Sequence, residues 1–264
     1  MAFRLAVSSD THLNYVSSGE ATELGMSASK LHGADALLLC GDISEATTVE
    51  QALLDVDAGF HRPIFAVLGN HDYYGGSFAE VHAKLAALSK RHPRITWLRT
   101  AGVVALTPTT ALVGIDGLAD CAHGQPLAGA GVINDCRLIQ DLRGMDPIRK
   151  VEIMLAKAKV DVAVLERNLV KALRKFNEVI VATHVPPFPE MASEKPDDVR
   201  SWYVARLMGD MLIRVADKFP KKRIRVRCGH VHRTMTINPA PNLTVSSGEA
   251  AYSYPAIHTT LELQ

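Results

Sequence analysis

Five short groups of polar residues hold the side chains best suited to chemistry, and each group directly follows an apolar run. They combine carboxylate, amide and imidazole groups: Asp10-Thr11-His12, Gly41-Asp42, Gly69-Asn70-His71-Asp72, Thr183-His184 and Gly229-His230-Val231-His232. If the apolar runs are neighbouring strands, the groups meet at the carboxyl edge of a sheet, where open α/β sheets bind ligands. We therefore expect seven donors to face one crevice: Asp10, His12, Asp42, Asn70, His184, His230 and His232.

The donor types favour a centre of two divalent metal ions. Oxygen and imidazole ligands without a thiolate suit Mn, Fe, Zn or Ni, and seven donors are too many for one ion. Two ions about 3.5–4 Å apart can activate a bridging hydroxide and bind the attacking and leaving oxygens of a displacement at phosphorus. A shared carboxylate would set the separation of the ions, and Asp42 is the natural candidate. The hypothesis is metal-dependent hydrolysis of a phosphoester.

Each group taken alone has a plainer explanation, because aspartate and histidine are common turn and capping residues at strand ends. The co-occurrence of all five groups argues against coincidence. A glycine precedes three of them, and we expect Gly41, Gly69 and Gly229 to allow tight backbone turns.

Taken together, the five motifs resemble the signature of the calcineurin-like metallophosphoesterases over nearly the whole chain. The resemblance implies an α/β fold, a four-layer α/β/β/α sandwich of two mixed β-sheets flanked by helices, with a dinuclear site at one sheet edge. It also implies the ligand sets, in which Asp42 bridges the ions and His71 is a catalytic histidine that binds no metal. One ion would have Asp10, His12 and His232 as ligands, and the other Asn70, His184 and His230.

The motifs leave the substrate open. Ile43 and Ser44 follow Gly41-Asp42 where Ser/Thr protein phosphatases carry an Asp-Arg pair, and Asp72 replaces their usual Glu. The pattern is closer to bacterial-type phosphodiesterases, so we predict a phosphodiesterase acting on a small molecule, with nucleotides among the options. A phosphomonoesterase or pyrophosphate-bond hydrolase of the same fold is the alternative. A non-catalytic interaction scaffold is the alternative of a different class, and retention of all donors and of His71 argues against it.

Residues near the motifs have two readings each. Asp72 either orients His71 or is an exposed turn residue. Tyr73 and Tyr74 either line a substrate pocket or cover the sheet edge. We expect substrate selectivity to lie in the glycine-rich segment 117–145, in which His123 is read as a surface histidine, and in the loops 185–198 and 247–255.

Strand-like runs alternate with helix-like stretches, which is typical of an α/β domain. The expected strands are 3–7, 36–39, 64–68, 111–115, 179–182 and 224–226, followed by an antiparallel C-terminal set at 234–237, 243–246 and 257–263. The expected helices are 21–32, 45–58, 77–90, 147–176 and 198–217. Asp146 and Pro147 form an N-cap and N1 pair, and a break near Lys159 is left open. We predict a single domain, 1–264, with a cap insertion at about 117–176.

Composition excludes few functions. The 264 residues carry 29 Lys and Arg against 28 Asp and Glu, so no net field draws the protein to nucleic acid or an anionic membrane. Alternation in the basic stretch 221–227 puts Arg223, Arg225 and Arg227 on one strand face, which we read as solvated. We expect no nucleic-acid partner.

The N-terminus lacks the apolar region of a signal peptide, and no apolar run reaches the roughly 20 residues that span a bilayer. We therefore expect a cytoplasmic protein without a membrane partner; its oligomeric state is not indicated. The separated cysteines Cys40, Cys121, Cys136 and Cys228 are expected to be buried thiols.

Overall fold

Two mixed β-sheets form the centre of the fold, and the computed structural model describes residues 2–264. The strands are β1 (Phe3–Ser8), β2 (Ala36–Cys40), β3 (Ile64–Val67), β4 (Ile95–Trp97), β5 (Val104–Ala105), β6 (Thr110–Gly114), β7 (Glu178–Ala182), β8 (Arg223–Cys228), β9 (Met235–Ala240), β10 (Leu243–Ser247) and β11 (Thr259–Leu263). The helices are α1 (Ser18–Lys30), α2 (Val49–Phe60), α3 (Phe78–Arg91), α4 (Leu98–Ala101), α5 (Pro126–Gly129), α6 (Asp135–Leu138), α7 (Pro147–Leu173) and α8 (Arg206–Lys218).

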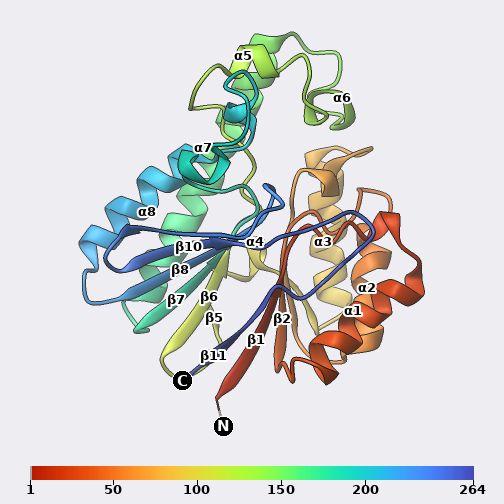
Figure 1. Cartoon of the computed structure of the whole chain (residues 1–264), viewed down its shortest axis with the longest axis vertical. Helices are drawn as coiled ribbons and strands as arrows, with labels where there is room; N and C mark the ends of the chain where they lie inside the picture. The colour runs from red at the N-terminus through yellow and green to blue at the C-terminus, as the bar shows by residue number, and fades with distance from the viewer. Residues whose placement is uncertain (1) are drawn as a thin grey trace.

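The strand orders are β11-β1-β2-β3-β4 and β5-β6-β7-β8-β10-β9. Strands β1 to β4 are parallel to one another, as are β6, β7, β8 and β10, while β11, β5 and β9 pair antiparallel at the sheet edges. Helices α1 to α3 cover the first sheet, and α7 and α8 cover the second (Figure 1). The predicted α/β/β/α sandwich is therefore confirmed, as is antiparallel pairing near the C-terminus.

The continuous apolar runs have a direct structural cause, because the central strands are buried on both faces. In β2, Leu37 and Leu39 pack against the helices of the first sheet, whereas Leu38 packs between the two sheets. A third core, under α7 and α8, contains alternate residues of β8 such as Ile224 and Val226. These three apolar layers hold the carboxyl ends of the parallel strands in place.

Helix starts follow local capping signals. Ser17 with Glu20 and Ser77 with Glu80 form capping boxes at α1 and α3, and Asp146 caps α7 as predicted. Helix α7 runs for 27 residues without a break at Lys159. Despite that length, neither α7 nor any other helix within residues 2–264 has an apolar stretch able to cross a membrane.

The main errors of the sequence prediction lie in short or irregular segments. Strands β4 and β5 were not predicted, since three and two residues give no readable periodicity. The predicted helix 198–217 is wrong in its first eight residues, because α8 begins only at Arg206. The preceding residues form a single 3-10 turn, in which the buried Trp202 donates its indole N–H to the Pro126 carbonyl at 3.0 Å. That tertiary contact replaces a regular helical turn.

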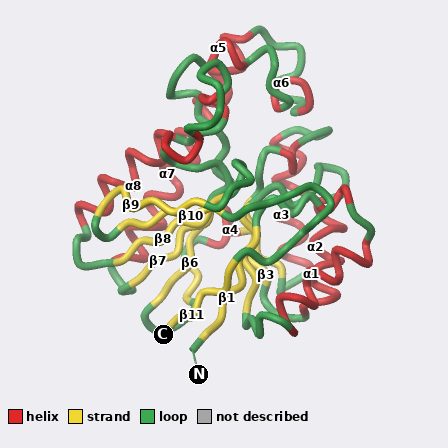
Figure 2. The backbone as a smooth tube through the Cα atoms, in the orientation of Figure 1, coloured by secondary structure: helices red, strands yellow, loops and turns green. Residues whose placement is uncertain are grey.

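The segment between β6 and α7 stands above the carboxyl edge of the sheets, with α5 and α6 at the top of Figure 2. Its buried side chains, among them Cys136 and Leu142, pack with Met154 near the start of α7. All four cysteines are buried free thiols, as expected. The division into one domain with a cap insertion at about 117–176 stays a prediction.

A buried carboxylate, Asp116, connects the two sheets. It follows β6, and its oxygens accept hydrogen bonds from the Leu68 backbone N–H (3.0 Å), the Trp97 indole (2.8 Å) and the Tyr73 hydroxyl (3.1 Å). The guanidinium of Arg99 lies 3.6 Å from the same carboxylate. Asp116 therefore holds the loop after β3 against the second sheet.

Replacing Asp116 with alanine is expected to lower the free energy of unfolding by about 3–5 kcal/mol, because several buried donors lose their acceptor. Burial alone would raise the pKa of Asp116, but hydrogen bonding to His82 and the charges of Lys157 and Arg99 lower it from 3.8 to about 2. The stabilisation is thus present above the unfolded pKa and is lost as the pH falls through the folded value. Urea denaturation measures it against Asp217→Ala, an exposed control, and a loss below about 1 kcal/mol would contradict this role.

Candidate metal centre

All five polar groups lie at carboxyl ends of parallel strands, and the structure brings their side chains together. Asp10 and His12 follow β1, Asp42 follows β2, and Asn70 follows β3. His184 follows β7, while His230 and His232 follow β8 of the same sheet. The site therefore spans the junction of the two sheets, with three loops from the first and two from the second.

The backbone at these positions is unusual. Eight non-glycine residues of the described chain have positive φ, and five are expected donors: Asp10, His12, Asp42, His230 and His232. Aspartate and histidine adopt the left-handed region more readily than most residues, yet each such position costs free energy. Such strain is typical of a functional site.

The glycines before the donors are required for two different reasons. Only Gly41 has a positive φ, at 83°. A Cβ at Gly69 would overlap the Asp42 carboxylate, and one at Gly229 would overlap Asp10. At Gly69 and Gly229, the absence of a Cβ therefore lets a neighbouring donor approach the backbone.

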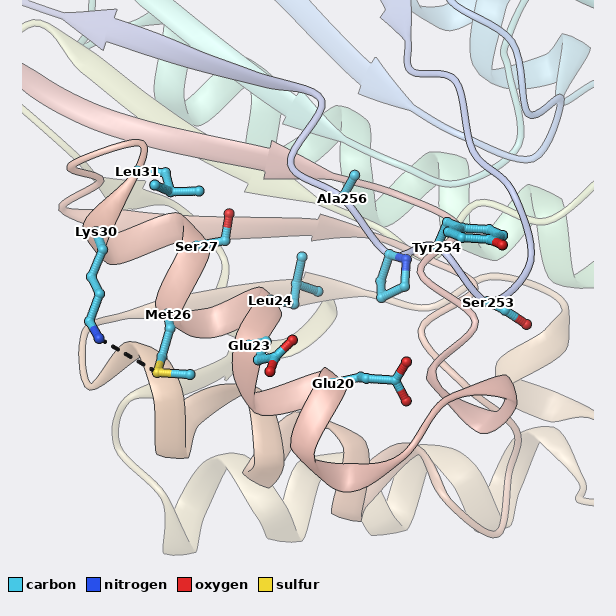
Figure 3. A pocket seen from close by; sticks show the side chains of 11 residues that line it. Glu20, Glu23, Leu24, Met26, Ser27, Lys30, Leu31, Ser253, Tyr254 and Ala256 are labelled. Carbon is cyan, nitrogen blue, oxygen red and sulfur yellow. Dashed lines mark hydrogen bonds between the residues drawn. The ribbon is translucent and has the colours of Figure 1, made fainter.

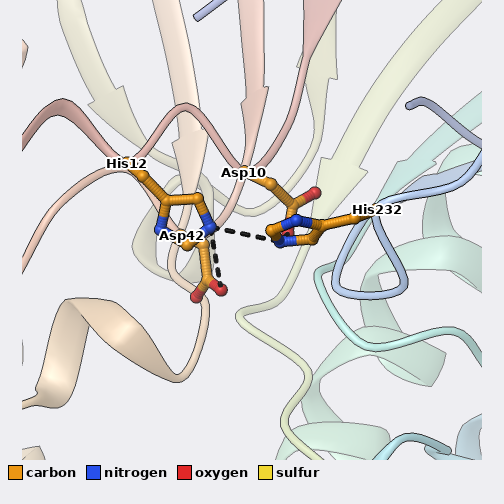
Figure 4. A group of neighbouring side chains, drawn as sticks. All are labelled: Asp10, His12, Asp42 and His232. Carbon is orange, nitrogen blue, oxygen red and sulfur yellow. Dashed lines mark hydrogen bonds and ion pairs between the residues drawn. The ribbon is translucent and has the colours of Figure 1, made fainter. Parts of the chain in front are cut away.

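The first cluster of donors contains Asp10, His12, Asp42 and His232 (Figure 4). The Nε2 atoms of His12 and His232 are 3.2 Å apart, and His232 Nε2 lies 3.4 Å from Asp10 Oδ1. Asp42 Oδ2 lies 4.0 Å from His12 Nε2. Two imidazole nitrogens and two carboxylates therefore converge on one point.

The second cluster contains Asp42, His184 and His230, with Asn70 beside them. His184 Nε2 lies 3.2 Å from both Asp42 Oδ1 and Asn70 Oδ1. A carbonyl accepts a hydrogen bond from each imidazole: Cys40 from His184 Nδ1 at 2.9 Å, and Trp202 from His230 Nε2 at 3.2 Å. Because a carbonyl only accepts, these bonds place the proton and leave His184 Nε2 and His230 Nδ1 free to bind a metal.

The charges of the two donor clusters favour the binding of cations. Burial lowers the pKa of His12 to about 4 and that of His230 to about 3, so both imidazoles are neutral, as ligands must be. Burial alone would lower the pKa of His184, but the adjacent Asp42 carboxylate raises it to about 10, so binding of a cation at Nε2 would release a proton. Within residues 2–264, the buried Asp10 Oδ2 and His12 Nδ1 have no hydrogen-bond partner. The donor set therefore fits two divalent ions that share Asp42.

The sequence profile described as calcineurin-like phosphoesterase matches residues 3–233. The chain belongs to this family. Membership identifies a hydrolase of phosphoester bonds that depends on metal ions, and implies a centre of two divalent ions. The expectation of an enzyme rather than a scaffold is thereby confirmed.

Solved structures show that the phosphoesterase shares its fold with distant proteins. A phosphopantetheinyl hydrolase from Mycobacterium tuberculosis is 14% identical, with a TM-score of 0.70 over 95% of this chain and 90% of its own. A dimetal phosphatase from Danio rerio is 13% identical, with a TM-score of 0.64 over 99% and 93%. GAP50, the anchor in the inner membrane complex of Plasmodium, is 11% identical, with a TM-score of 0.52 over 98% and 76%. No curated protein matches the sequence.

Beside the two clusters, the phosphoesterase places His71 at a pocket. His71 Nε2 lies 3.9 Å from Asp42 Oδ2, and its ring packs on Tyr74 with centroids 4.3 Å apart. Asp72 is fully buried, so it is not an exposed turn residue. It also accepts no hydrogen bond from the His71 ring, whose Nδ1 is buried without a partner in the described chain. Its oxygens accept the backbone N–H groups of Ile43 and Ser44 at 3.0 and 2.8 Å, and that of Gly69 at 2.8 Å. Asp72 therefore joins the loops that carry Asp42 and Asn70.

The pocket has a volume of about 130 Å³, and its walls combine polar donors with the aromatic side chains of Tyr74, Trp202, Tyr203 and Tyr252. Tyr74 lines it, whereas Tyr73 is buried away from it. Segments 117–145 and 247–255 contribute as expected, but 185–198 does not, and His123 does not line it. Ile133, Asn134 and Asp135 come from the first of these segments, and Tyr252 comes from the second. Sequence reasoning missed Trp202 and Tyr203, which have no motif of their own.

A second hollow, of about 600 Å³, lies between α1 and the loop 253–256 (Figure 3). It is larger than the pocket beside His71, but none of the seven donors lines it. Leu24 and Tyr254 give it apolar surface, and the charged residues that line it are Glu20, Glu23 and Lys30. Size therefore does not locate the chemistry in this phosphoesterase.

Asp135 of α6 contacts one of the expected metal ligands directly. Its Oδ1 accepts hydrogen bonds from Asn70 Nδ2 at 2.9 Å and from the Tyr74 hydroxyl at 2.6 Å. Asn70 Nδ2 also donates to the Tyr74 oxygen at 3.0 Å. With both amide hydrogens engaged, the Asn70 Oδ1 atom is directed at His184 and the second cluster.

Replacing Asp135 with alanine is expected to weaken binding of one ion by about 10- to 100-fold, because Asn70 loses the partner that orients it. Titration of Mn²⁺ followed by calorimetry measures this effect. Asp141→Asn is the matched control. Asp141 lies in the same segment as Asp135 and accepts a hydrogen bond from the Phe78 N–H at 2.7 Å, but it contacts none of the seven expected metal ligands. Unchanged affinity for both ions in Asp135→Ala would remove the positioning role.

Proposed function

We propose that this phosphoesterase hydrolyses a small phosphodiester that carries a planar group, such as a nucleotide. The observation that supports the proposal is the lining of the pocket, to which no lysine or arginine of the described chain contributes. Phosphomonoesters and pyrophosphates carry more than one negative charge, and proteins commonly grip them with arginine. A diester carries a single charge, for which the metal ions and His71 are sufficient.

We assign each donor by the cluster in which it lies. Asp10, His12 and His232 would hold one ion, Asn70, His184 and His230 the other, and Asp42 both. When bound, two such ions lower the pKa of water and stabilise charge on phosphate oxygens. Protonation of the leaving oxygen and contact with the ester group are assigned to the side chains around the ions.

His71 is the group placed to protonate the leaving oxygen, because it lines the pocket beside the shared carboxylate of Asp42. Aromatic side chains form the walls on both sides. The Tyr203 ring is 4.6 Å from that of His230, and the Tyr252 ring is 4.4 Å from that of His12. They would limit access of water and offer flat surfaces to a planar ester group.

The test compares hydrolysis of bis-p-nitrophenyl phosphate and p-nitrophenyl phosphate by chelator-treated protein, with and without Mn²⁺. We expect Mn²⁺-dependent turnover with a higher kcat/KM for the diester. A higher kcat/KM for the monoester would make the protein a phosphomonoesterase, contrary to the proposal. A cyclic nucleotide compared with dimethyl phosphate then tests the planar group, and equal kcat/KM values would exclude it.

A further inference from the structure

The basic strand β8 faces inward, unlike the solvated surface expected from its sequence. Ile224 and Val226 pack under α7 and α8, so alternation turns Arg225 and Arg227 toward the side of the first sheet. Arg227 accordingly lines a cavity with Val7 of β1 and Thr259 of β11. Both arginines are partly buried, and only Arg223 at the strand start is exposed.

Arg225 and Arg227 differ in their partners. Arg225 forms an ion pair with Glu178 on the adjacent strand β7. Arg227 forms no side-chain hydrogen bond or ion pair with any residue from 2 to 264, and its Nε atom is buried without a partner. Burial and the charge of Arg225 lower the pKa of Arg227. A buried guanidinium nitrogen without an acceptor costs free energy, and an anion bound beside Arg227 would supply that acceptor.

The cavity beside Arg227 has the chemistry of an anion site. It measures about 260 Å³, and its lining contains hydroxyl groups, the imidazole of His258 and no carboxylate. The Ser246 hydroxyl accepts a hydrogen bond from Thr236 at 3.0 Å, which leaves its own proton to donate. Gly248 makes room for the imidazole, since a Cβ there would overlap the His258 ring.

We propose that this cavity binds a small oxyanion of the phosphate class, held by the Arg227 guanidinium and the hydroxyl of Ser246. A guanidinium presents several N–H groups in a plane that matches the oxygens of such an anion. A volume of about 260 Å³ is sufficient for an anion of this size.

The cavity is separate from the metal centre but shares two loops with it. None of the seven donors lines it. Cys228, which does, is followed in sequence by the turn carrying His230 and His232. Gly248 and His258 flank the loop that places Tyr252 over the metal centre. A bound anion would therefore contact the ends of both segments.

Calorimetric titration of the Mn²⁺-loaded full-length protein with inorganic phosphate tests the proposal. We expect two classes of site in the unmodified protein, one at the metal centre and one in the cavity. Arg227→Gln should weaken the second class by about 10- to 100-fold and leave the first unchanged. Arg223→Gln is the matched control on the same strand face, and should keep both classes.

A second variant keeps the proposal testable if Arg227→Gln does not fold. Ser246→Ala removes one hydroxyl donor and should weaken the same class several-fold. Asp42→Asn should lose the metal-centre class and keep the cavity class, which separates this site from the hydrolytic one. Equal phosphate binding in the unmodified protein, Arg227→Gln and Ser246→Ala would overturn the proposal, as would a single class abolished by Asp42→Asn.

Discussion

Asp42→Asn is expected to reduce hydrolysis by about 10³-fold or more and to lower the metal content from two ions to at most one. Asp42 is the one carboxylate that lies in both donor clusters, with Oδ1 at 3.2 Å from His184 and Oδ2 at 4.0 Å from His12. Asparagine keeps the shape but removes the negative charge and one of the two metal-binding oxygens. Loss of several kcal/mol of charge stabilisation corresponds to a rate change of this size.

Elemental analysis and steady-state kinetics on the same samples measure this result. Asp217→Asn serves as the control, because this residue of α8 is exposed and belongs to neither donor cluster. Near-normal thermal denaturation of the chelator-treated Asp42→Asn protein would show that the fold is intact. Two bound ions together with activity within threefold of the unmodified protein would contradict the shared role of Asp42.

His71→Gln is expected to lower kcat by about 10²- to 10⁴-fold while both ions stay bound, because His71 belongs to neither donor cluster. Its ring reaches the pocket, and its backbone N–H donates to Asp42 Oδ1 at 2.9 Å, a bond that the substitution keeps. The expected deficit therefore comes from the imidazole alone. His123→Gln, outside the pocket, is the matched control.

The leaving group separates protonation from other roles of His71. A p-nitrophenolate leaves without needing a proton, whereas an alkoxide needs one. The kcat of His71→Gln should therefore fall much further for an alkyl phosphodiester than for bis-p-nitrophenyl phosphate. Equal losses on both substrates would argue that His71 stabilises charge without donating a proton, and loss of bound metal would make it a ligand.

Local sequence determined the central strands and the positions of the seven donors along the chain. Runs such as that of β2 are apolar throughout because both faces are buried, and such runs are recognisable without knowledge of their neighbours. Donors placed directly after parallel strands must meet at one sheet edge, whatever the loops between them do. The capping boxes at Ser17 and Ser77 similarly depend on residues three positions apart.

Tertiary structure decided the features that depend on residues far apart in sequence. Asp135 bonds to Asn70 across 65 positions, and nothing local to α6 indicates that partner. The same holds for Trp202, whose burial under the Pro126 carbonyl interrupts the predicted helix. Period-two alternation correctly placed Arg227 on one face of β8, but only the packing of the two sheets determined that this face is enclosed. Short-range geometry is encoded in neighbouring residues, whereas burial and partner choice arise only when distant segments pack together.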